Sequence, residues 1–168
     1  SYDVMIGAGL TDKAGVYLHG LLSPGGTKKL LLVTDDCVNA LRGDRCESSL
    51  RDAGFEVSRF VFPMGEASKN LSTLGDLLEF AAGIPLTRTD AFVALGGGVV
   101  GDLTGFAASV YLRGIPYIQI PTTLLAMVDS SVGGKTAVDL AAGKNLAGSF
   151  YQPSLVLADT DTLGTLPG

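Results

Sequence analysis

The sequence predicts an α/β fold, with a parallel, Rossmann-like sheet and helices on both of its faces. Three observations support this: apolar runs alternate with segments of helical spacing, the runs are continuously apolar like strands covered on both faces, and the connections are short. The 168 residues, of which 46% are apolar and 23 are glycine, provide enough material for one ordinary domain with a core and many turns. We therefore expect one α/β domain over residues 1–168.

Short apolar runs mark six strands. The clearest is Lys-Leu-Leu-Leu-Val-Thr at residues 29–34, which has the composition of a strand buried on both faces. The run at 56–62 ends at Pro63, and the run at 91–95 leads into a glycine turn. The expected strands are residues 2–6, 29–34, 56–62, 91–95, 117–120 and 155–158.

Helical spacing fills the intervals between these strands. The first expected helix ends at the turn Ser23-Pro24-Gly25-Gly26, and the second ends at Gly54. Leucines and an alanine three or four residues apart mark one face of a further helix, between residues 71 and 81. The expected helices are residues 12–22, 38–53, 71–81, 99–112 and 124–131, and the glycine-rich stretch 133–148 has no assigned element.

Polar or glycine residues follow four of the expected strands. Asp35 follows one strand, residues 64–66 follow the next, and residues 96–98 and 121–123 follow two others. Parallel α/β sheets bind ligands at the carboxyl ends of their strands, where the strand order switches. We therefore expect a ligand site at this edge.

Residues 96–101 fit the pattern G-x-G-x-x-G, between an expected strand and an expected helix. Such a turn presents backbone N–H groups to a diphosphate. The next strand ends in Pro-Thr-Thr at 121–123 and lacks the usual acidic residue. This is therefore not a standard Rossmann fingerprint, and Asp35 or Asp36 would have to hold the ribose hydroxyls of a dinucleotide.

Several charged residues have both a structural and a functional interpretation. Asp102, in the first turn of a helix, either complements the helix dipole or holds ligand hydroxyls or a basic side chain. Arg113 either complements the dipole at the helix end or binds phosphate. Glu66 and Lys69 either cap and pair across a helix start or line a nucleotide pocket.

The segment Gly134-Lys135-Thr136 resembles the end of a P-loop. Asp129 stands where that motif requires its first glycine, and no strand leads into the segment, so we reject a nucleoside triphosphatase. Lys135 and Lys144 nevertheless follow glycines, which permit close approach of a ligand. They place two ammonium groups near a glycine-rich loop.

Composition excludes several classes of function. The net charge is −5 and the basic residues are dispersed, so we expect no nucleic-acid partner. No apolar run approaches the length of a membrane span and no basic-then-apolar leader is present, which predicts a cytoplasmic protein without a membrane partner. The low charged fraction of 17% suggests a large buried interface with another copy or a second domain.

Cysteine and histidine content argues against disulfides and metal. Cys37 and Cys46 are nine residues apart in one expected helix, which separates them by roughly 13 Å along the axis, too far for a disulfide. We expect both to be buried or half-buried thiols in a reducing compartment. With one histidine, His19, in a helix, no metal site is expected from this chain alone.

Together these segments resemble the N-terminal half of the 3-dehydroquinate synthase family. The resemblance covers essentially the whole chain, and the block from Asp129 to Thr136 is its most specific part. One departure is Asp139-Leu140, where many members have Asn-His. The segments that carry the resemblance are Gly65-Glu66-x-x-Lys69, Gly96-Gly97-Gly98-Val99-Val100-Gly101-Asp102-Leu103, Arg113-Gly114, Pro121-Thr122-Thr123-Leu124-Leu125, Val128-Asp129-Ser130-Ser131-Val132-Gly133-Gly134-Lys135-Thr136, Gly143-Lys144-Asn145-Leu146 and Phe150-Tyr151-Gln152-Pro153.

The resemblance implies roles for individual residues. It implies a catalytic set that reaches substrate or cofactor, with Arg113 reaching the substrate phosphate of the neighbouring subunit in a homodimer. The implied catalytic residues are Asp129, Lys135, Lys144, Asn145 and Arg113. The implied NAD-binding residues are Asp35, Gly65, Glu66, Lys69, Gly97, Gly98, Val99, Val100, Gly101, Asp102, Thr122, Thr123, Lys135, Lys144, Thr162, Leu163 and Thr165.

The family reaction converts 3-deoxy-arabino-heptulosonate 7-phosphate to 3-dehydroquinate and phosphate in the shikimate pathway of aromatic amino acid biosynthesis. The resemblance implies NAD as cofactor, with a divalent metal (Zn or Co) held only in the full-length enzyme. The family's helical metal-binding half is not in this sequence, so we expect an NAD-binding domain of a two-domain lyase that is inactive or nearly so alone. The alternatives are a related sugar-phosphate cyclase, a metal-dependent polyol or alcohol dehydrogenase, and a non-enzymatic cofactor-binding or assembly module.

Overall fold

The computed structural model describes residues 1–165 of the chain. A six-stranded sheet forms its centre, and every neighbouring pair of strands is parallel. This confirms the predicted fold class, and the six expected strands are all present. In spatial order the strands are β1 (Asp3–Gly7), β8 (Leu155–Asp159), β5 (Tyr117–Pro121), β4 (Ala91–Gly96), β2 (Lys29–Asp35) and β3 (Glu56–Phe62).

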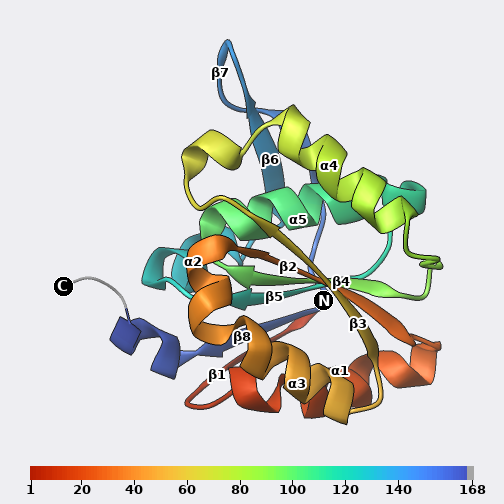
Figure 1. Cartoon of the computed structure of the whole chain (residues 1–168). Helices are drawn as coiled ribbons and strands as arrows, with labels where there is room; N and C mark the ends of the chain where they lie inside the picture. Colours follow the sequence, from red (N-terminus) through yellow and green to blue (C-terminus); the bar gives the residue numbers. More distant parts are fainter. Residues whose placement is uncertain (166–168) are drawn as a thin grey trace.

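Helices cover both faces of the sheet (Figure 1). On one face lie α1 (Ala14–Leu22) and α3 (Asp44–Asp52), and on the other lie α4 (Leu71–Ala82) and α5 (Gly98–Val110). Alternate residues of β2 serve the two cores, because Leu30 and Leu32 belong to the first and Leu31 and Val33 to the second. All four are at most 1% exposed, which explains why this strand reads as an unbroken apolar run. Within residues 1–165, no helix is long and apolar enough to span a membrane.

The expected helix over residues 38–53 is divided into three parts. A short α2 (Asp36–Val38) leads into a π-helical turn (Asn39–Gly43), which leads into α3. The expectation that both cysteines are at least half-buried was wrong for Cys37, which is exposed, whereas Cys46 is fully buried. Cys37 lies at the start of α2, beyond the carboxyl edge of the sheet, where no opposing layer covers it.

Two further helical expectations needed correction at their ends. α5 stops at Val110 rather than at residue 112, because Leu112 (φ 51°) and Arg113 (φ 65°) adopt left-handed backbone conformations. The expected helix at 124–131 is present over residues 124–130, but its last five residues, Ala126–Ser130, form a π-helical turn. Both segments connect α5 and β5 to their neighbours without extending the sheet.

The glycine-rich stretch forms an antiparallel hairpin that the sequence reading did not assign. Its strands are β6 (Lys135–Leu140) and β7 (Gly143–Phe150). The hairpin packs on α5 and projects beyond it (Figure 1). Val138 anchors it in the core on the α4/α5 face. Lys135 therefore begins a strand, not a helix, which agrees with the rejection of a P-loop.

Candidate nucleotide-binding site

The topology opens a crevice between β2 and β4. The chain passes from β2 outward to β3, and from β4 in the opposite direction to β5. Neighbouring connections therefore leave the sheet on opposite faces at this point, which is where α/β sheets bind ligands. The four strand ends singled out in the sequence belong to four adjacent strands, so they meet at one edge.

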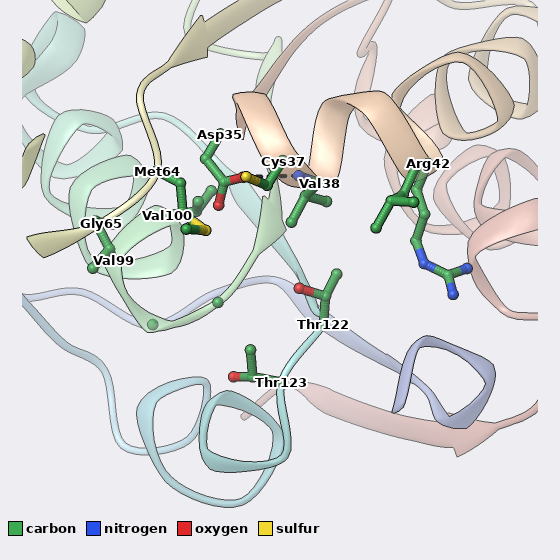
Figure 2. A pocket seen from close by; sticks show the side chains of 13 residues that line it. Asp35, Cys37, Val38, Arg42, Met64, Gly65, Val99, Val100, Thr122 and Thr123 are labelled. Carbon is green, nitrogen blue, oxygen red and sulfur yellow. Dashed lines mark hydrogen bonds between the residues drawn. The ribbon is translucent and has the colours of Figure 1, made fainter. Parts of the chain in front are cut away.

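A cavity of about 390 Å³ lies at this switch point. Asp35 enters it from the end of β2, and the glycine turn Gly97–Gly98 enters from the end of β4 (Figure 2). The first N–H groups of α5 have no partner within the helix, so they are available to an anion there. Eight of the predicted cofactor residues line this cavity: Asp35, Gly65, Gly97, Gly98, Val99, Val100, Thr122 and Thr123.

The Asp35 carboxylate has a fixed position. Its Oδ1 accepts the N–H of Val38 at 2.8 Å and so caps the start of α2. The residue is 7% exposed. Since one oxygen is engaged in the cap, the second remains as an acceptor that faces the cavity, which suits a ribose hydroxyl.

Four cavity residues were not predicted from the sequence, whereas Met64, at an expected strand end, was placed at this edge. Val38 and Leu41 share a helical face three residues apart, directly after Asp35, and this spacing could have revealed them. Arg42 lies at the same end, where its Nη2 donates to the carbonyl of Asp161 at 3.2 Å. The missed lining residues are Cys37, Val38, Leu41 and Arg42.

A buried ion pair connects three predicted site residues beside the cavity. Lys69 Nζ donates to Asp102 Oδ2 at 2.7 Å and to Asn145 Oδ1 at 2.6 Å. Lys69 is 5% exposed. Burial raises the pKa of Asp102, and the hydrogen bond from Lys69 opposes that rise. Of the interpretations considered for Asp102, the structure therefore shows a carboxylate that holds a basic side chain, and this contact ties α5 to the hairpin.

Glu66 and Asp139 form a second pair near the turn of the hairpin. The Asp139 N–H donates to the Lys69 carbonyl at 2.9 Å, and the Asn145 N–H donates to Asp139 Oδ1 at 2.9 Å. A side-chain hydrogen bond to Asp139 raises the pKa of Glu66, whereas the N–H of Asn145 and the bond from Glu66 lower the pKa of Asp139.

A second cavity, of about 380 Å³, lies between α5 and the hairpin. Asp102, Lys135 and Asn145 line it, together with the hydroxyls of Thr136 and Ser149. Lys69 hydrogen-bonds two residues of this lining, Asp102 and Asn145. The arrangement offers one ammonium group, one carboxylate and several hydroxyl or amide groups, a set suited to a hydroxyl-rich anion.

The remaining predicted residues are not among those that line these two cavities. Arg113 is exposed and lies beyond the end of α5 at Val110, whereas Asp102 lies near the start of that helix, roughly 12 Å of helix before its end. Asp129 and Lys144 are exposed, Leu163 is half-buried, and Gly101 is buried within α5. Thr162 is buried, its hydroxyl donating to the Asp159 carbonyl, and Thr165 ends the described chain in the 3₁₀ segment Thr160–Thr165.

The described residues fit a dinucleotide better than a metal. Asp35, Asp36 and Cys37 bring two carboxylates and a thiol within 4.8 Å of one another. However, Asp35 is engaged in capping α2 and Asp36 Oδ1 accepts the N–H of Met64 at 2.9 Å. The cluster is thus explained by local structure, and we assign no metal to it.

These features define a Rossmann-like α/β domain with a nucleotide-sized crevice at its switch point. A model of the 3-dehydroquinate synthase N-terminal family matches residues 59–168, which is most of the chain. The chain belongs to the 3-dehydroquinate synthase family. The resemblance stated from the motifs is confirmed.

Curated relatives show how much of such a protein this chain represents. The chain is 53% identical over 167 residues to the 3-dehydroquinate synthase of Caulobacter vibrioides, covering 99% of this chain and 45% of that protein. It is 53% identical over 166 residues to the 3-dehydroquinate synthase of Symbiobacterium thermophilum, covering 99% and 46%. The chain therefore spans slightly less than half the length of the curated relatives that it matches.

Solved structures of similar proteins include sugar-phosphate cyclases with cofactor. A 2-deoxy-scyllo-inosose synthase complexed with carbaglucose-6-phosphate, NAD+ and Co2+ superposes with a TM-score of 0.89 at 32% identity, covering 99% of this chain and 44% of that one. A 2-epi-5-epi-valiolone synthase from Streptomyces hygroscopicus subsp. jinggangensis, with NAD+ and Zn2+, has a TM-score of 0.85 at 35% identity, covering 99% and 45%. A glycerol dehydrogenase from Schizosaccharomyces pombe shares the fold, with a TM-score of 0.76 at 22% identity.

Proposed function

We propose that this chain is the NAD-binding part of a 3-dehydroquinate synthase, which converts 3-deoxy-arabino-heptulosonate 7-phosphate to 3-dehydroquinate and phosphate. The observation that carries the proposal is the cavity at the switch point, with the free N–H groups of α5 at one side and the fixed Asp35 carboxylate at the other. Family membership and NAD in the structures of two related cyclases support it.

Each side of the cavity has a role in holding NAD. The N–H groups at Gly98 and Val99 would bind the diphosphate, and Asp35 would accept from the adenosine ribose hydroxyls. Thr122 and Thr123, at the end of β5, lie on the opposite side of the glycine turn from Asp35. The nicotinamide half would therefore extend toward β5 and the second cavity.

Bound NAD supplies reversible hydride transfer at a ring hydroxyl of the substrate. The chain's contribution is to bind and orient the reactants. Lys135 would hold an anionic part of the substrate, while Asp102, fixed by Lys69, would accept from its hydroxyls. The contacts of the buried Lys69 with Asp102 and Asn145 keep these groups in place without reorganisation, which favours a precise geometry for reaction.

The metal and the substrate phosphate require groups beyond this chain's own cavities. The described residues provide no convincing metal site, so we propose that Zn or Co is bound by residues outside this sequence. Arg113 is exposed at the far end of α5, a position suited to a site in a neighbouring subunit of a homodimer. The two free thiols agree with a reducing compartment such as the cytoplasm.

Calorimetry with matched variants tests the cofactor site. Asp35→Asn keeps an acceptor for the α2 cap but removes the charge offered to ribose, and we expect about a tenfold loss of NAD affinity. Asp36→Asn is the control, because Asp36 hydrogen-bonds Met64 and does not line the cavity. Equal affinities for wild type and Asp35→Asn would argue against the proposed ribose contact.

The reaction itself is tested on the full-length natural protein. We expect phosphate release from the heptulosonate with no net NADH, and none from the 168-residue piece alone. Preference for a different sugar phosphate would favour a related cyclase, which the TM-score of 0.89 to 2-deoxy-scyllo-inosose synthase makes the second candidate. Net NADH from a simple polyol would instead indicate a dehydrogenase.

A further inference from the structure

A cluster outside the cavity is centred on Arg59 of β3. Its Nη1 donates to Asn39 Oδ1 at 2.8 Å and to Asp44 Oδ1 at 3.0 Å, and its Nε donates to Glu47 Oε1 at 3.1 Å. The Arg59 side chain is only 19% exposed. One guanidinium group therefore joins β3 to the first residue of the π-helical turn and to α3, which follows the turn.

That π-helical turn, Asn39–Gly43, forms one end of the cofactor cavity. Leu41 and Arg42 lie in the turn and Val38 directly precedes it, and all three line the cavity. Turns of this kind are uncommon and often occur at functional sites. The Arg59–Asn39 hydrogen bond connects the start of this turn to β3.

Gly43 shows how closely the groups in this cluster are fitted. A Cβ at Gly43 would lie 2.3 Å from Asn39 Oδ1 and 2.9 Å from Arg59 Nη1. A side chain at this position would displace the amide or the guanidinium. The absence of a side chain at Gly43 therefore leaves room for the contact between Arg59 and Asn39.

We propose that Arg59 is a positioning residue for the adenosine end of the cofactor site. It holds the π-helical turn so that Val38 and Leu41 form an apolar wall for the purine beside the ribose-binding Asp35. Lysine cannot replace it fully, because a single ammonium group does not present the planar fork that reaches three acceptors. This inference rests on the proposed binding of NAD.

The alternative is that Arg59 only stabilises the helix, and Arg51 provides a matched control for it. Arg51 Nε donates to Glu47 Oε2 at 3.1 Å, and its Nη2 donates to the Val57 carbonyl at 2.5 Å. Arg51, which lies in α3, thus contacts the same glutamate as Arg59 and connects α3 to the same strand, β3. Its described hydrogen bonds do not include the π-helical turn.

The test compares Arg59→Met, Arg59→Lys and Arg51→Met in the full-length natural protein, by calorimetry with NAD, AMP and nicotinamide mononucleotide. For Arg59→Met we expect NAD and AMP affinities to fall about tenfold while mononucleotide affinity stays within about twofold. We expect Arg59→Lys to be intermediate. We expect Arg51→Met to lower the Tm comparably while all three affinities stay within about twofold.

Several results would overturn the positioning role. NAD and AMP affinities unchanged in Arg59→Met would do so, as would equal losses for AMP and mononucleotide, or the same losses in Arg51→Met. If Arg59→Met does not fold, Arg59→Lys is judged by the same three ligands. If the wild-type protein binds no NAD, the proposed function is overturned as well. If the wild-type protein binds NAD and Arg59→Met binds it with the same affinity, only the positioning role is overturned.

Discussion

Removing the Lys69 ammonium group should strongly destabilise the domain. In Lys69→Met, the Asp102 carboxylate loses its counter-ion and Asn145 Oδ1 loses its donor. The side chains of Lys69 and Asp102 are only 6% and 16% exposed, so water compensates little. Breaking a buried pair of this kind typically costs 3–5 kcal/mol, and the partial exposure of Asp102 places the expected loss near the lower end, at about 3 kcal/mol.

The double variant separates charge from packing. Asp102→Asn removes the charge that Lys69→Met leaves uncompensated, so the double variant should be more stable than Lys69→Met by about 1–2 kcal/mol. The free energy of unfolding is measured by urea titration, followed by circular dichroism, for wild type, both single variants and the double variant. A double variant no more stable than Lys69→Met would contradict the uncompensated charge as the cause.

The pH dependence provides an independent test of the same cause. Burial already raises the pKa of Asp102 from 3.8, and Lys69 opposes that rise. Without Lys69 the pKa rises further, so the folded variant binds a proton more readily than the unfolded chain does. The difference in unfolding free energy between wild type and Lys69→Met should therefore shrink as the pH falls through the variant's Asp102 pKa. A loss that does not change with pH would refute the reasoning.

Three further predictions concern the core, acid stability and thiol reactivity. Alanine usually stabilises a helix relative to glycine by about 1 kcal/mol. Gly105→Ala should nevertheless lower the Tm, because the added Cβ would lie 2.5 Å from Thr136 Cγ2 of the hairpin. An unchanged or higher Tm would contradict this packing. Burial acts to raise the pKa of Asp90, but hydrogen bonds from three backbone N–H groups outweigh it and hold that pKa below 3.8. Asp90→Asn should therefore lower the free energy of unfolding by about 1–2 kcal/mol at neutral pH, and this loss should disappear as the pH falls through the pKa of Asp90 in the folded protein. A loss that urea titrations show to be independent of pH would exclude this explanation. A thiol reagent should label the exposed Cys37 but not Cys46, because burial raises the pKa of the Cys46 thiol to about 12. NAD should slow the labelling of Cys37, because Cys37 lines the cavity. Labelling at the same rate with and without NAD would count against that placement.

The central sheet could be predicted from the sequence because the local composition of each strand indicates its structure. The β2 run is apolar on both faces, and both faces are in fact covered, so local composition and tertiary burial agree. The strand ends could be grouped for the same reason, since parallel strands place their carboxyl ends together. Asp35 and the glycine turn are therefore brought to one cavity, as expected.

The hairpin and the π-helical turn depend on partners that are distant in sequence. Alternate burial in β6, at Thr136 and Val138, is a strand pattern, but the surrounding glycines obscured it and the connection to β7 lacks a typical turn sequence. The π-helical turn is contacted by Arg59, which lies 20 residues beyond Asn39. Local propensity cannot reveal such a contact, and the cavity residues in this turn were missed as a consequence.

A crystal structure with bound NAD would test the central claim most directly. We predict that the diphosphate lies at the N–H groups of Gly98 and Val99, with the adenosine ribose on Asp35 and the purine against Val38 and Leu41. Cofactor bound elsewhere, or a glycine turn without diphosphate in crystals saturated with NAD, would contradict the account.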